Sequence, residues 1–149
     1  MLTDPARDQW LRNAAFVYAI AFVVHTGDHL RRGTESTTTH VFVLGTAAAV
    51  LQVIAIGAVL TRHRLAPVFA VAVGFPDALG IAAVHFLPDW GVFSDAFPNA
   101  HGTGVTTFSW IAGGAEVVAA FLFGLAGWYA LKSTRDPRLR RRVLLRSGA

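Results

Sequence analysis

Two apolar runs in the middle of the chain decide the fold: VFVLGTAAAVLQVIAIGAVL over residues 41–60 and LAPVFAVAVGFPDALGIAAVHFL over residues 65–87. Only the polar tetrapeptide TRHR, residues 61–64, separates them. An α-helix needs about 20 mostly apolar residues to cross the hydrocarbon core of a bilayer, and each run supplies that length. Two such helices joined by so short a link predict a transmembrane hairpin.

Two further segments extend the pattern on either side of this hairpin. Residues 10–29 are apolar over most of their length, and residues 105–131 end in the aromatic pair Trp128 and Tyr129, which is typical of a membrane interface. Apolar residues make up 54% of the chain and charged residues only 15%, well below the quarter or so found in soluble domains. We therefore expect an all-α integral membrane protein, an up-down bundle of four transmembrane helices forming a single domain over residues 1–149.

The basic residues predict the orientation of this bundle, because Lys and Arg favour the cytoplasmic side of short loops. Eleven of the thirteen lie near the N-terminus, in the link 61–64 or in the tail 132–149, whereas only Arg31 and Arg32 lie in the first loop. This distribution predicts a multi-pass protein of the inner, plasma membrane with both termini in the cytoplasm. The tail suits the anionic head groups of membrane lipids, so lipids are the expected partner and nucleic acid is not.

The third loop and the tail carry predictions of their own. The loop, residues 88–104, lacks Lys and Arg but contains Trp90, Phe93 and Phe97, so we expect it to fold back over the mouth of the bundle or to lie in the interface. The basic tail is either a short amphipathic helix on the inner leaflet or a solvated flank of the last span.

Five of the six histidines fall at the outer ends of the predicted spans. His25 and His29 are four residues apart and share one helix face, and the other three lie at the ends or starts of later spans. In a chain without cysteine, imidazole and carboxylate are the natural ligands for zinc, iron, copper or manganese. The candidate metal ligands are His25, His29, His40, His85, His101, Asp28 and Asp89. The alternative is that each histidine only bonds a backbone carbonyl or a lipid phosphate, and that no metal is bound.

The spacing of four of these histidines also suggests an internal repeat. His25 and His85 each follow a valine at the end of a span, and His40 and His101 follow them fifteen and sixteen residues later. This pattern favours a pseudo-repeat of two hairpins. Haem, which needs two axial histidines from facing helices, ranks below a single metal ion because the histidines lie near the rim of the bundle.

Three polar residues are expected near the centre of the bilayer, where ionisable groups are costly and by default suggest function. They are Gln52, Asp77 and Glu116, and Tyr18 is expected to continue their polar stripe toward the histidines. We expect the two carboxyl groups to face one another and to share a proton. The alternative is that a protonated Asp77 bonds Gln52, or backbone freed by the adjacent Pro76, and only locks helix packing.

These residues support several functions. The first is a metal-dependent membrane enzyme for a lipophilic substrate, with Glu116 or Asp77 as the acid–base group. The second is a metal-free cyclase or isomerase of an isoprenoid-like molecule, in which Asp77, Glu116, Tyr18 and Gln52 act within aromatic walls that stabilise a cation. Those walls would be formed by Phe16, Phe22, Phe75, Phe108 and Trp110. A proton, metal or solute transporter built from an oligomer, or an accessory subunit of a membrane complex, stays open beside them.

Overall fold

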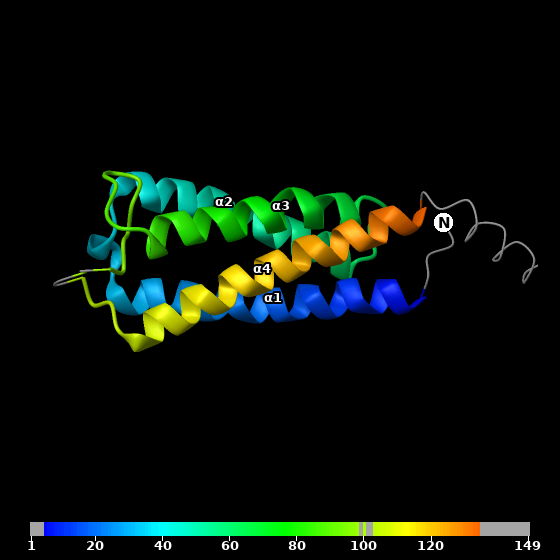
Figure 1. The fold of residues 1–149 in the computed structure, drawn as a ribbon, viewed down its shortest axis with the longest axis horizontal. Helices are drawn as coiled ribbons and strands as arrows, with labels where there is room; N and C mark the ends of the chain where they lie inside the picture. Colours follow the sequence, from blue (N-terminus) through cyan, green and yellow to red (C-terminus); the bar gives the residue numbers. More distant parts are fainter. Residues whose placement is uncertain (1–4, 99, 101–102, 135–149) are drawn as a thin grey trace, which may run out of the picture.

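The computed structural model describes residues 5–98, 100 and 103–134 of the chain. Four long helices form a bundle within these residues: α1 (Pro5–Arg32), α2 (Thr39–Leu60), α3 (Ala66–Ile81) and α4 (Thr107–Thr134). A short 3₁₀ helix, η1 (Thr34–Ser36), follows α1, and a π-helical turn, η2 (Ala82–Phe86), continues α3. Each helix runs antiparallel to the one before it, so the start of α1 and the end of α4 lie at the same end of the bundle (Figure 1). The predicted all-α four-helix bundle is confirmed.

Three of the helices in the described part of the chain are long and apolar enough to cross a membrane: Thr39–Leu60, Ala66–Phe86 and Thr107–Lys132. The prediction of four spans is thus supported for three, because α1 does not meet the same criterion. At 28 residues α1 is about 42 Å long, so its composition and not its length sets it apart. Its polar side chains Tyr18, His25 and Asp28 are buried against the other helices.

The interior is built from small residues, which bring the helix backbones close together. Alanines make up most of the buried core, and α4 packs most extensively against α3 and α1. A Cβ atom on Gly74 would lie 2.6 Å from the backbone oxygen of Ala120 and 2.6 Å from the backbone nitrogen of Gly124. Such contact requires glycine, as in other membrane helix pairs with small residues at the interface. The second helix, α2, packs less extensively against its neighbours α1 and α3.

The chain after η2 folds back over the end of the bundle. Pro88 has no N–H with which to continue the helix and bond the carbonyl of Val84. That carbonyl instead accepts a hydrogen bond of 3.0 Å from the backbone N–H of Asp95, and the backbone N–H of Phe97 donates to the carbonyl of His85 at 2.8 Å. Phe97 is buried, with its ring stacked on that of His85. The loop thereby covers His85 at this end of the bundle. The predicted amphipathic helix in the tail lies outside the described residues.

Candidate metal centre

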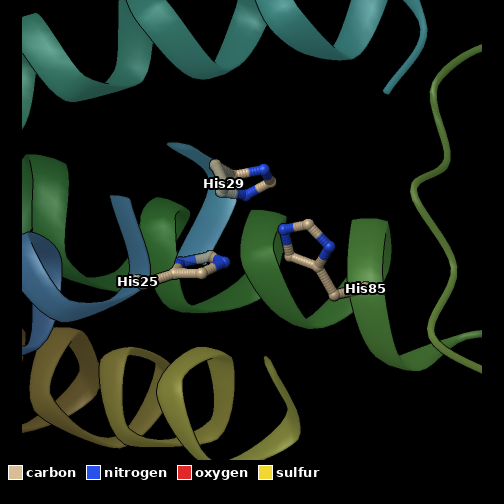
Figure 2. Close-up of side chains that lie close together, drawn as sticks. All are labelled: His25, His29 and His85. Atoms are coloured by element: carbon tan, nitrogen blue, oxygen red, sulfur yellow. The ribbon is translucent and has the colours of Figure 1, made fainter. Parts of the chain in front are cut away.

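Three histidines from two helices converge near the end of the bundle where α1 and α3 end (Figure 2). His25 and His29 lie one turn apart on α1, and His85 projects toward them from η2. Their ring centroids are 4.8 to 5.3 Å apart. One ligating nitrogen of each histidine lies within 4.8 Å of the others. His25 and His85 are buried, whereas the side chain of His29 is 32% exposed.

The π-helical turn η2 positions the third histidine. It interrupts the α-helical bonding of α3 over Ala82–Phe86, and π-helical turns of this kind are frequent at functional sites. Two contacts hold the ring of His85 in place. The ring stacks on Phe97 with centroids 4.6 Å apart, and its Nδ1 lies 3.0 Å from the backbone oxygen of Asp95. Since a carbonyl oxygen can only accept, Nδ1 carries the proton and donates it. The Nε2 of His85 is therefore the nitrogen with the free lone pair.

A carboxylate oxygen lies within 4 Å of the Nδ1 of each of the three histidines. The Nδ1 of His25 lies 2.5 Å from Oε2 of Glu116 on α4, and both side chains are buried. The Oδ2 of Asp95 lies 3.5 Å from Nδ1 of His85 and 3.9 Å from Nδ1 of His29. Histidine ligands of metals almost always bond a carboxylate or carbonyl through their second nitrogen, which fixes the tautomer and the ring orientation. His25 and His85 both show this arrangement.

The donor set fits a transition metal. Among the described residues, the Nε2 of His25 is buried without a hydrogen-bond partner, which costs free energy unless a ligand occupies the position. Two nitrogens bound to one tetrahedral zinc ion at 2.0–2.1 Å would lie about 3.4 Å apart, so the three rings would close by about 1 Å onto a common ion. Three imidazoles without a thiolate suit zinc, copper, iron or nickel. The three-histidine group could therefore hold one metal ion.

A second polar network lies deeper in the bundle. The hydroxyl of Tyr18 donates to Oδ2 of Asp77 at 2.6 Å, and Nε2 of Gln52 donates to Oδ1 of the same carboxyl group at 2.7 Å. All three side chains are buried. The hydrogen bonds of Asp77 thus go to Tyr18 and Gln52, whereas that of Glu116 goes to His25. The hydrogen bond between Gln52 and Asp77 is the one expected if Asp77 only stabilises the packing of the helices.

A cavity of about 510 Å³ connects the two polar groups. Its ionisable lining residues are the three histidines, Asp77 and Glu116. Gln52 and three threonines are the other polar side chains of the lining, and most of the remaining wall is apolar. Of the five aromatic residues expected to wall such a cavity, only Phe22 lines it. Phe75 instead packs on Phe121 and Trp110 on Phe86, while Phe16 and Phe108 are about half exposed. The predicted set of aromatic wall residues is therefore wrong for four of its five members, although Phe42 and Phe93 also line the cavity.

Other predicted ligands lie apart from the three histidines. His40 is exposed at the start of α2 and contacts Phe93 edge-on. Asp28 is buried, but its Oδ1 accepts hydrogen bonds from Arg31. Asp89 is exposed, and its Oδ1 accepts a hydrogen bond from the backbone N–H of Gly91. It does not lie on the same helix face as His85, because the helix ends at Phe86. The remaining candidate, His101, lies outside the described residues. The predicted pseudo-repeat includes this histidine and therefore stays a prediction.

The structure also adds two residues that the sequence analysis did not single out. Asp95 contacts His85 and His29 as described, and Arg32 holds its carboxylate with two hydrogen bonds of 2.9 and 2.6 Å. The side chain of Arg32 is fully buried, and its Nε also donates to the carbonyl of Thr103. A signal was present in the sequence, because Asp95 is one of only two acids in a loop without Lys or Arg.

Comparison with known proteins adds no family to this description. No protein-family model matches the chain, and no curated protein or solved structure matches it. The function is therefore argued from the site itself.

Proposed function

We propose that this chain is a membrane enzyme in which His25, His29 and His85 bind one divalent transition-metal ion that acts on a lipophilic substrate in the adjoining cavity. The observation that carries the proposal is the convergence of three histidine nitrogens within 4.8 Å, at the wall of a largely apolar cavity. Three protein ligands and an open position are the pattern of catalytic zinc sites, whereas structural sites are closed by four protein ligands.

The residues around the histidines suit such chemistry. A bound metal ion would polarise a substrate oxygen or activate a water molecule. Glu116 orients His25 through its contact with Nδ1. Asp77 lines the same cavity, so a carboxyl group lies within the site to take up or deliver a proton. Because both carboxyl groups belong to the cavity wall, the proposal needs no further acid–base residue.

The same proposal includes α1 as a fourth span, with both termini in the cytoplasm of the cell. Helix α1 is as long as α4, and its polar side chains His25 and Asp28 are buried in the bundle and do not face lipid. Eleven of the thirteen Lys and Arg would then lie on the cytoplasmic side. The histidines would lie near the opposite face of the membrane.

Elemental analysis tests the proposal. The protein is purified in mild detergent without chelators, and we expect about one zinc, copper, iron or nickel ion per chain. His25→Ala and His85→Ala should each abolish retention of the ion, whereas His63→Ala, at an exposed histidine between α2 and α3, should keep it. Absence of stoichiometric metal from unaltered protein that was never exposed to chelator would refute the proposal.

A metal-free acid–base enzyme is the second candidate, and the bonding of Asp77 by both Tyr18 and Gln52 favours it. Such an enzyme would keep its activity in chelator and lose it in Asp77→Asn. The metal enzyme would lose activity in chelator and regain it on addition of the ion. Transport and an accessory role stay predictions.

A further inference from the structure

The walls of the cavity indicate what kind of molecule it holds. We infer that the ligand is an uncharged lipophile with a hydroxyl or carbonyl oxygen at one end, which reaches the histidines from the hydrocarbon of the membrane beside the first half of α2. The inference rests on the proposed function for the metal ion that this oxygen would bind. The size of the ligand, its route and its charge each have separate support.

The size follows from the cavity. Its volume of about 510 Å³ lies within the range of small-molecule sites in proteins, which is about 300–1,000 Å³. Its walls are largely apolar, and its ionisable groups are confined to the three histidines, Asp77 and Glu116, with Gln52 and three threonines as further polar side chains. A molecule with an apolar body and one polar end matches this distribution.

The route follows from the exposure of α2. One face of α2 carries Gly45, Gln52 and Val59 at intervals of seven residues. Gln52 and Val59 are buried, whereas Gly45 is exposed. Gly45 and the half-exposed Leu44 both line the cavity, so the cavity opens beside the first half of α2. This part of α2 belongs to a candidate membrane span, Thr39–Leu60. The opening would therefore face hydrocarbon and not water.

The charge follows from the lining. Asp77 and Glu116 line the cavity, and among the described residues no Lys or Arg does. The nearby guanidinium groups are engaged elsewhere, Arg31 with Asp28 and Arg32 with Asp95. The formal charges of two carboxylates would already balance that of a divalent metal ion, and the lining offers no side-chain cation, so an anionic head group would leave the cavity with a net negative charge. An ammonium group has no lone pair for a metal ion. An uncharged oxygen avoids both problems.

Cobalt-loaded protein in lipid nanodiscs provides the test, with three probes of equal chain length: 1-dodecanol, dodecanoate and dodecane. Binding is measured by native mass spectrometry, and contact with the metal by the visible absorption bands of Co²⁺. We expect 1-dodecanol to bind at least about tenfold more tightly than dodecanoate and to change the cobalt spectrum. Dodecane should leave the spectrum unchanged because it carries no ligand atom.

The route is tested by Gly45→Trp, with Ala47→Trp as a matched control on an exposed part of α2 that does not line the cavity. A Cβ atom on Gly45 meets nothing within 4 Å, so the new side chain can occupy the opening without moving the backbone. Gly45→Trp should weaken 1-dodecanol binding at least about tenfold with cobalt still bound, and Ala47→Trp should not.

Each result has a distinct meaning. Equal or tighter binding of dodecanoate would overturn the inference about charge, and this comparison needs only the unaltered protein. Unchanged binding in Gly45→Trp would overturn the inferred route. A failure of cobalt itself to bind would instead refute the proposed function, while native mass spectrometry would still decide whether the cavity prefers the alcohol.

Discussion

Removing the carboxylate behind His25 is the sharpest test of the metal centre. Glu116 is 2% exposed, and its Oε2 lies 2.5 Å from Nδ1 of His25. It occupies Nδ1, so the lone pair of His25 is left on Nε2, which has no partner among the described residues. Substitution of Glu116 should therefore weaken metal binding even though this side chain need not touch the ion.

The magnitude depends on what replaces the carboxylate. Loss of such a partner typically lowers metal affinity 10- to 100-fold, which corresponds to about 1.4 to 2.7 kcal/mol. Glu116→Gln keeps an oxygen that can accept from Nδ1 of His25, so we expect a loss near the lower limit of about tenfold. Glu116→Ala removes the acceptor and leaves Nδ1 unpaired in the interior, so we expect a loss near about 100-fold.

Competition with a chromophoric chelator of known affinity measures the effect on purified protein. Asp28→Asn is the matched control, because Asp28 is a fully buried carboxylate three residues from His25 whose hydrogen bonds go to Arg31. It should change metal affinity by less than about threefold. If Glu116→Gln and Glu116→Ala bind the metal as tightly as the unaltered protein while remaining folded, the histidines do not form the site we describe.

Three further predictions concern stability, each measured as the free energy of unfolding in detergent. Gly74→Ala should destabilise the fold by about 1–3 kcal/mol because its methyl group would meet the backbone of α4, and Gly57→Ala, with open space around its Cβ, should not; equal effects would contradict the close approach of α3 and α4. Tyr18→Phe should cost about 1.5–3 kcal/mol because it removes a buried hydrogen bond to a carboxyl group, and a loss under about 0.5 kcal/mol would show that this bond contributes little. Arg32→Gln should cost about 3–5 kcal/mol, since it leaves the carboxylate of Asp95 buried without its cation, and retention of full stability would contradict that pairing.

The helices could be predicted from the sequence because hydropathy and length constrain membrane spans strongly. The runs 41–60 and 65–87 correspond to Thr39–Leu60 and Ala66–Phe86 within two residues at each end. The run 10–29 corresponds to the middle of α1, whose ends extend beyond it on both sides. Its composition places it outside the candidate spans, and its polar side chains include the buried Tyr18, His25 and Asp28.

The site could be predicted only in part, because helix periodicity reports neighbours on one helix and not the fold of a loop. The pairing of His25 with His29 follows from their spacing of four residues. Asp95 lies ten residues after His85, and its contact depends on a loop that folds back through the carbonyl freed by Pro88. A helical pattern cannot encode that path. For this reason the sequence pattern favours Asp89, whereas the acid of this loop that lies beside the histidines is Asp95.

The helices that carry the histidines and the helix that forms much of the cavity wall differ in how extensively they pack. The three histidines and Glu116 lie on α1, α4 and η2, and among the four long helices α4 packs most extensively, against α3 and α1. Ligands held on such rigid elements keep their geometry before an ion arrives, which lowers the cost of binding it. The fourth helix, α2, contributes no histidine to the group and packs least, yet it forms much of the cavity wall. In the proposed function, α2 would therefore be the part of the wall that yields to a membrane-borne substrate, while the histidines on the other elements would keep their positions.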